Sequence, residues 1–152
     1  MGNVLVSLVQ VKSDDQESPD IRYERVLAEV VDLAQGTHRS LNNKKPDLIL
    51  LPELWHYGPF NVEAAINNPT TFPGAISEDF CDIASTHGVW IHAGSFIESQ
   101  DNSLFNTSLI NLIIPSLFNS SFIESCSLIQ VSPHSGHFRF LLALIDWEIS
   151  NS

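Results

Sequence analysis

The chain opens with an apolar run, residues 4–11, which only two polar residues interrupt. Such a run, rich in β-branched residues, is typical of a strand covered on both faces, so we expect a central strand here. Ser18 and Pro19 then supply a helix N-cap and a proline at the first helical position. Apolar positions recur at helical spacing from there until Gly36, which predicts a helix that packs one face on the sheet. These positions are Ile21, Val26, Leu27, Val30, Val31 and Ala34.

A second apolar run, residues 47–51, follows the polar turn 42–46. The order strand, helix, strand predicts a parallel pair of strands joined by a right-handed crossover. Residues 56–71 contain glycine, proline and asparagine breakers around a short helical stretch at 62–66. We expect this segment to be a loop, and loops after such a strand usually shape a pocket.

The pattern then turns to one more helix and two more strands. Ser77 caps a helix that Gly88 ends. Residues 89–97 and 104–114 have the composition of strands, and the short polar turn 98–103 between them implies an antiparallel hairpin. The whole pattern predicts an α/β fold in a single domain.

One acid follows the second apolar run directly, in the hexamer Leu-Leu-Pro-Glu-Leu-Trp that ends at Trp55. Pro52 lacks an amide donor and favours departure from the sheet, which places Glu53 at the carboxyl end of the strand. Open α/β sheets bind ligands at that end, and a carboxylate there lies in low dielectric close to solvent. The position predicts a catalytic Glu53 that faces a cleft. A structural Glu53 that merely closes the strand is the alternative.

The composition changes after residue 111. Residues 112–152 hold nine serines, one glycine and four charged residues, whereas the first 111 residues hold fifteen acids and six bases. We therefore divide the chain into a domain at 1–111 and a divergent tail at 112–152. A truncated or frame-shifted reading of a longer gene would produce this boundary.

The bulk composition limits the classes of binding partner and the cellular compartment that we expect for this protein. A formal net charge of −11 argues against nucleic acid and anionic membrane surfaces, which attract clustered lysine and arginine. The amino terminus lacks a secretory pattern, and two widely spaced cysteines fit a reducing cytoplasm, so we expect a cytoplasmic protein. His134 and His137 are spaced like a metal pair, but no neighbouring acid or histidine completes a site. We therefore predict no metal and no cofactor.

Three blocks of sequence resemble the nitrilase superfamily, the carbon-nitrogen hydrolases, over about residues 3–110. They are residues 4–11, residues 46–55, and residues 88–98 followed by 104–110. The resemblance implies the amino-terminal half of a four-layer α-β-β-α sandwich, truncated at about residue 111, and a possible homo-oligomer. An incomplete sheet leaves an open edge and an uncovered apolar face, which predicts poor solubility.

The resemblance also implies a mechanism based on glutamate, lysine and cysteine, with a small amide, nitrile or carbamoyl compound as substrate. Matched to the family motif, Glu53 is the general base. The family supplies its lysine from a Tyr-Arg-Lys segment after the strand that ends near residue 110, yet this chain has no lysine after Lys45. Cys126 does not lie in the family's cysteine motif, and Cys81 falls inside a predicted helix. We therefore expect the chain to be inactive.

Aromatic and imidazole side chains follow the candidate base, and we expect them to line a substrate pocket. The alternative function is a non-catalytic α/β binding or interaction module in which Glu53 is structural. A pocket that collects Glu53 with a tail thiol favours the enzyme, whereas a filled strand end favours the module. The predicted pocket residues are Trp55, His56, Tyr57 and Phe60.

Overall fold

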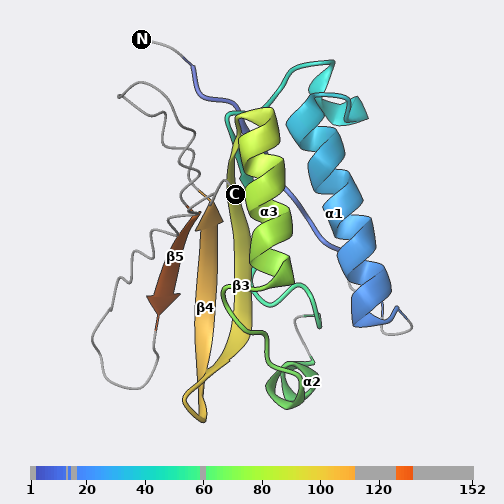
Figure 1. Cartoon of the computed structure of the whole chain (residues 1–152). Helices are drawn as coiled ribbons and strands as arrows, with labels where there is room; N and C mark the ends of the chain where they lie inside the picture. Colours follow the sequence, from blue (N-terminus) through green and yellow to red (C-terminus); the bar gives the residue numbers. More distant parts are fainter. Residues whose placement is uncertain (1–2, 13, 15–16, 59–60, 112–125, 132–152) are drawn as a thin grey trace, which may run out of the picture.

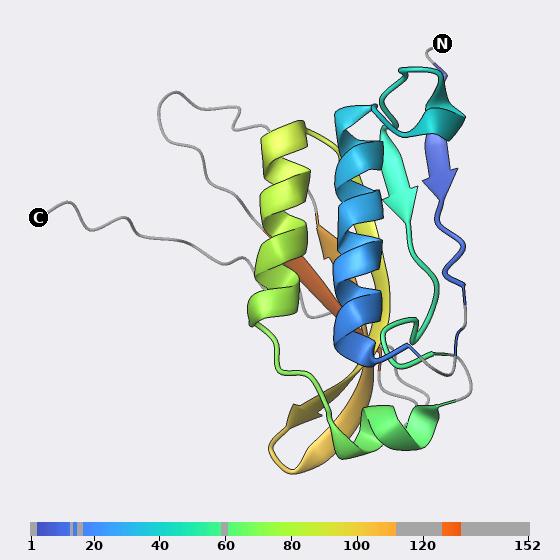
Figure 2. The same cartoon turned by 90° about the vertical axis from the view of Figure 1, so that its right-hand side faces the viewer.

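The computed structural model describes residues 3–12, 14, 17–58, 61–111 and 126–131 of the chain (Figure 1). These residues form a five-stranded mixed sheet with helices on one of its faces (Figures 1 and 2), and the predicted α/β fold is confirmed. The strands, which follow one another across the sheet in sequence order, are β1 Val6–Leu8, β2 Leu48–Leu50, β3 Trp90–Gln100, β4 Ser103–Asn111 and β5 Cys126–Val131. The helices are α1 Pro19–Gln35, the 3₁₀ turn Arg39–Leu41, α2 Val62–Asn67 and α3 Ala75–His87.

Helix α1 begins and ends where the sequence predicts. The hydroxyl of Ser18 accepts a hydrogen bond from the Ile21 amide at 3.3 Å, and Gly36 closes the helix with φ +77°. The buried stripe differs from the predicted one in its first turn, because Ile21 is 60% exposed and Arg22 is buried in its place. The rest of the stripe, which includes Val26 and Val30, packs on the sheet as expected.

The predicted parallel pairing is confirmed, but the expected place of the first strand is wrong. β1 pairs parallel with β2, and β2 pairs parallel with β3. β1 lies at the edge of the described sheet and is not central. Ser7 faces the helices, whereas Val6 and Leu8 on the other face are 43% and 76% exposed. The helices cover one face of the sheet, so the apolar run is buried on one side only.

The predicted hairpin of β3 and β4 is also confirmed, with a tighter turn than expected. Only Asp101 and Asn102 separate the two strands, and both have positive φ, 51° and 60°. Two such residues form a hairpin turn that matches the natural twist of the strands. β5 then pairs antiparallel with β4. It lies beyond the predicted domain boundary at residue 111, which stays a prediction.

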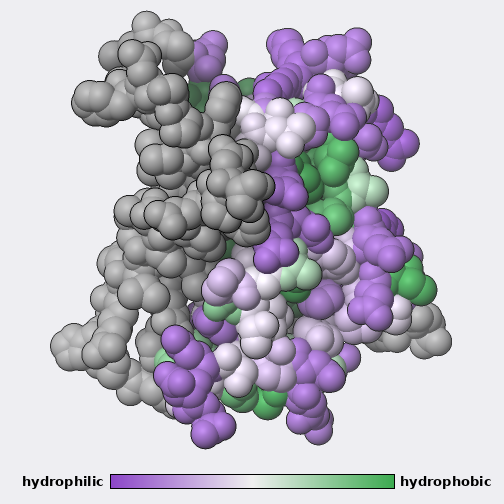
Figure 3. Space-filling view, in the orientation of Figure 1, coloured by the Kyte–Doolittle hydropathy of each residue, from purple (hydrophilic) through white to green (hydrophobic). Residues whose placement is uncertain are grey.

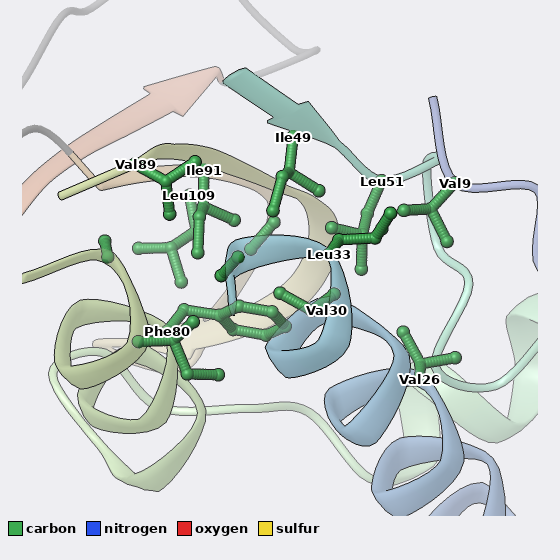
Figure 4. Packing of buried hydrophobic residues seen from close by; sticks show 14 of the residues in the cluster. Val9, Val26, Val30, Leu33, Ile49, Leu51, Phe80, Val89, Ile91 and Leu109 are labelled. Atoms are coloured by element: carbon green, nitrogen blue, oxygen red, sulfur yellow. The ribbon is translucent and has the colours of Figure 1, made fainter. Parts of the chain in front are cut away.

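The core fills the space between the sheet and the pair α1 and α3 (Figure 4). In the coloured part of Figure 3, hydrophilic residues cover much of the surface, and apolar residues show in separate areas. In the described part of the chain, no helix is long and apolar enough to cross a membrane. His134, His137 and the other tail residues outside β5 lie beyond the described residues. The labelled core residues are Val9, Val26, Val30, Leu33, Ile49, Leu51, Phe80, Val89, Ile91 and Leu109.

Candidate active site

Glu53 lies three residues beyond the carboxyl end of β2, as the sequence predicts. The chain leaves the β2 ladder after Leu51, whose amide donates to the His92 carbonyl at 2.9 Å. It then runs beside β3, because Glu53 forms an isolated parallel bridge with Ser95 and the Leu54 amide donates to the Ser95 carbonyl at 3.0 Å. The Glu53 residue is exposed. The backbone pairing therefore fixes the Cα atom of Glu53 and leaves its carboxylate accessible.

The carboxylate of Glu53 has a partner that the sequence did not reveal. Asn106 of β4 donates a hydrogen bond from Nδ2 to Glu53 Oε1 at 2.6 Å, although the two residues are 53 positions apart. Asn106 is partly buried, and its Oδ1 has no hydrogen-bond partner among the described residues. The one available signal is the polar side chain of Asn106 on a strand that pairs with β3. Its contact with Glu53 depends on the register of the sheet.

A glycine in β3 makes room for the segment that carries Glu53. Gly94 has φ +82°, and the pairing of β3 with β4 shifts register between His92 and Ser95. A Cβ at Gly94 would lie 2.1 Å from the Pro52 carbonyl oxygen and 2.9 Å from Trp55 Cδ1. This β-bulge therefore lets residues 52–55 approach β3 closely.

Trp55 belongs to the core, which corrects the expectation that it lines a substrate pocket. It is 1% exposed, and its Nε1 donates to the Ala93 carbonyl at 2.8 Å. Its ring stacks on Tyr23 at a centroid distance of 6.0 Å and meets Phe80 and Phe96 edge-on. The indole is buried because the bulge gives its N–H a backbone partner and the neighbouring rings enclose it.

His56 and Tyr57 lie beside a cavity, but that cavity is too small for a substrate. Its volume is about 10 Å³, close to the space of one water molecule, whereas ligand pockets are about 300–1,000 Å³. Burial lowers the pKa of His56, and the His56 Nδ1 is buried without a partner among the described residues. Burial also raises the pKa of Tyr57. Phe60, the fourth predicted pocket residue, lies outside the described residues. The cavity is lined by Leu54, His56, Tyr57, Ala65, Thr70, Ser95, Phe96 and Ile97.

In the described part of the chain, neither the Cys81 side chain nor the backbone of Cys126 lies beside Glu53. Cys81 lies on α3 and packs against the core from the helix side of the sheet. Cys126 is the first residue of β5 and pairs with Asn111, five positions along β4 from Asn106. At about 3.3 Å per residue, the backbone of Cys126 lies roughly 16 Å along the strand from Asn106. The register therefore separates the backbone of Cys126 from Asn106, the partner of Glu53.

Nor do the described residues place a lysine beside Glu53. Lys12 pairs with Asp14 at 3.2 Å, and Lys44 and Lys45 precede β2 at its opposite end. A set of three side chains able to hold a metal ion is absent from the described part of the chain. Of the three groups that the predicted mechanism needs, the side chains that the structure describes supply only the carboxylate at this strand end.

Arg22 is a buried cation that contacts this segment, and its hydrogen bonds indicate a structural role. It is 3% exposed and donates to the His56 carbonyl at 3.1 Å, to the Asp14 carbonyl at 2.7 Å and to Glu17. The guanidinium donors of Arg22 are thus used in hydrogen bonds within the fold. Arg22 ties the first turn of α1 to the loop that follows Glu53.

Comparisons with known proteins point to one family. The chain matches the model of the carbon-nitrogen hydrolase family over residues 5–111. It is 32% identical over 113 residues to 2-oxoglutaramate amidase of Paenarthrobacter nicotinovorans, covering 72% of this chain and 35% of that protein. It also resembles the crystal structure of a CN-hydrolase superfamily protein from Xanthomonas campestris that has an arsenic adduct in its active site. That likeness has a TM-score of 0.59 at 22% identity and covers 86% of this chain and 41% of the other.

The chain has the fold of the nitrilase-type hydrolases, as the likeness to the solved structure shows. It belongs to the carbon-nitrogen hydrolase family, because the family model matches well over half of its length. The predicted family and the predicted amino-terminal half of the sandwich are both confirmed. The chain spans 35% of the length of the amidase and 41% of the solved chain.

Proposed function

We propose that Glu53 is the general base of an amidase-type carbon-nitrogen hydrolase. The observation that carries this proposal is an exposed carboxylate just beyond the carboxyl end of β2, held by Asn106 through a 2.6 Å hydrogen bond. General bases need both access to the reacting group and a fixed orientation. Glu53 has both, and the chain's family hydrolyses bonds between carbon and nitrogen.

The substrate that we propose is a small carboxamide. The relative from Paenarthrobacter is named as an amidase of 2-oxoglutaramate, which carries such a group. Nitriles and carbamoyl compounds are the other substrates that the family resemblance implies. In this reaction Glu53 accepts the proton of a nucleophile as that nucleophile attacks the carbonyl carbon, and a cation stabilises the oxyanion that forms.

We further propose that the chain alone does not turn over amides. Among the described residues, no lysine lies beside Glu53, and the backbone of Cys126 is paired five positions along β4 from Asn106. Losing one oxyanion-hole donor costs about 10²- to 10³-fold in rate, and the loss of the nucleophile acts on the same transition state. The base alone is therefore too little for hydrolysis of an unactivated amide.

One observation favours the alternative, a non-catalytic binding or interaction module. The Trp55 indole, two residues after Glu53, is buried in the core, and the cavity beside His56 and Tyr57 has a volume of only about 10 Å³. In such a module Glu53 would be structural, and its removal would affect the fold and not chemistry.

Two assays on the purified protein separate these functions. The first measures turnover of short amides, including 2-oxoglutaramate, and of nitriles and carbamoyl amines, for which we expect none. The second measures hydrolysis of an activated aryl ester, whose good leaving group reduces the need for a cation. A general base contributes about 10²–10⁴-fold, so we expect Glu53→Gln to remove the ester activity. The control is Glu63→Gln on α2, also an exposed glutamate. Ester rates unaffected by Glu53→Gln would refute the base and favour the module.

A further inference from the structure

Asn106 and Glu53 are brought together by the sheet and not by the sequence. Their side chains meet at 2.6 Å, with Asn106 Nδ2 as donor and Glu53 Oε1 as acceptor. We propose that Asn106 is a positioning residue that holds the Glu53 carboxylate in one orientation. This inference rests on the proposed function, in which Glu53 is the base.

The amide of Asn106 is directed by the carboxylate. Its Nδ2 donates to Glu53, whereas its buried Oδ1 has no hydrogen-bond partner among the described residues. Turning the amide over would place Oδ1 against a carboxylate oxygen, and two acceptors would face each other. An unpaired buried oxygen is costly, so the bond to Glu53 offsets that cost. Bonds to an ionised acceptor are also about twice as strong as neutral ones.

Both ends of the hydrogen bond are anchored on β3. The backbone of Glu53 bridges Ser95, and Asn106 lies opposite Ile97 in the antiparallel register. The next residue of β4, Thr107, is buried and donates its hydroxyl proton to Glu98 on the helix side of the sheet. Because successive side chains alternate between faces, this anchor fixes Asn106 on the opposite face. The backbones of the two partners therefore cannot separate without a shift of the sheet.

As a consequence, one carboxylate oxygen of Glu53 is held by Asn106, and the orientation of the whole carboxylate is restricted. Glu53 is exposed, so the hydrogen bond to Oε1 leaves Oε2 to accept a proton. A misplacement of about 1 Å can cost about 10²-fold in rate. Asn106 therefore restricts the carboxylate without contacting the reacting atoms.

Nuclear magnetic resonance of the whole chain tests the proposal directly. Protein with ¹⁵N-labelled asparagine is compared with its Glu53→Gln and Glu63→Gln variants, and the Asn106 side-chain amide is assigned by its loss in Asn106→Leu. We expect the amide proton signal of Asn106 to move upfield in Glu53→Gln, because the hydrogen bond then loses its charged acceptor. The signal should stay in place in Glu63→Gln. An Asn106 signal that is unchanged in Glu53→Gln, or that moves equally in Glu63→Gln, would overturn the proposal.

Two further measurements separate positioning from a merely structural role. In Asn106→Leu the order parameter of the Glu53 γ-methylene should fall, whereas Ser108→Ala, which changes the next residue on the same face of β4, should leave it unchanged. Any ester hydrolysis that depends on Glu53 should lose about 10-fold or more in kcat in Asn106→Leu, with little change in KM. An unchanged order parameter or kcat would contradict positioning.

Failure of the proposed function gives a different result. Ester hydrolysis would then be the same in Glu53→Gln as in the unsubstituted protein, although the Asn106 resonance of the unsubstituted protein would still report its hydrogen bond to Glu53. If Asn106→Leu does not fold, the amide signal of Asn106 in Glu53→Gln still decides, with assignment from sequential backbone connections.

Discussion

Gly94 and Pro52 approach so closely that a Cβ on Gly94 would lie 2.1 Å from the Pro52 carbonyl oxygen. We therefore expect Gly94→Ala to destabilise the protein by roughly 2–5 kcal/mol, the sum of left-handed backbone strain and overpacking. Urea unfolding monitored by tryptophan fluorescence measures this loss.

Gly88→Ala is the matched control for this substitution. Gly88 also has positive φ, 60°, but the nearest atom to its added Cβ is Lys45 Nζ at 3.7 Å. Only the backbone strain, about 1–2 kcal/mol, should then be lost. Equal losses in the two variants would mean that residues 52–55 do not press on the bulge.

Arg22 should stabilise the loop after Glu53 through its hydrogen bonds. Arg22→Met keeps a long apolar stem but removes the donors to the His56 and Asp14 carbonyls. We expect a loss of roughly 1–3 kcal/mol, the usual cost of leaving a buried polar group unpaired. Arg25→Met is the control, because Arg25 pairs with Glu17 at a more exposed site and should cost less. A larger loss in Arg25→Met would contradict the role given to Arg22.

The sequence predicts where the helices and strands of this fold begin and end better than it predicts which strands lie side by side. The Ser18 cap, the Gly36 stop and the strand that leads to Glu53 all depend on residues close together in the chain. The place of β1 in the sheet does not depend on nearby residues. An apolar run indicates a strand, but it does not say which other strands lie beside it. Its position at the edge of the described sheet follows from the order in which all strands pair.

The candidate site shows the same limit. Glu53 is predictable from its hexamer. Asn106 reaches Glu53 only because the register of the hairpin places Asn106 opposite Ile97. Trp55 follows Glu53 by two residues, and an aromatic side chain there suits a pocket or a core. The bulge at Gly94 decides for the core, because it offers the Ala93 carbonyl to the indole N–H.

His56 should make stability depend on pH. Burial is the main cause that lowers its pKa from the ordinary 6.5, with Arg22 also lowering it and Asp20 opposing. The folded chain therefore keeps His56 neutral at a pH where the unfolded chain binds a proton. The stabilisation is complete above about pH 6.5 and is lost as the pH falls from there toward the folded pKa. For one histidine the slope is below about 1.4 kcal/mol per pH unit, because the folded and unfolded states differ by less than one bound proton at this site.

Urea unfolding at pH 7.5, 6.5 and 5.5 tests this expectation. His56→Phe should flatten the dependence, and Tyr57→Phe should keep it, because the raised pKa of Tyr57 lies above this window. His92, whose pKa burial also lowers, should supply a residual slope in His56→Phe. Equal slopes in the native protein and His56→Phe would show that His56 ionises alike in both states.

The exposed face of the sheet should promote self-association. Leu8 is 76% exposed on the edge strand β1, and Trp90 on the same face of β3 is 48% exposed. A lysine on an edge strand opposes both apolar contact and strand pairing. We expect Leu8→Lys to reduce the associated fraction in sedimentation velocity without loss of stability. Ile21→Lys makes the same change in charge on α1, where Ile21 is 60% exposed, and should leave association unchanged. Equal reductions in both variants would assign the effect to net charge and reject the sheet face as its cause.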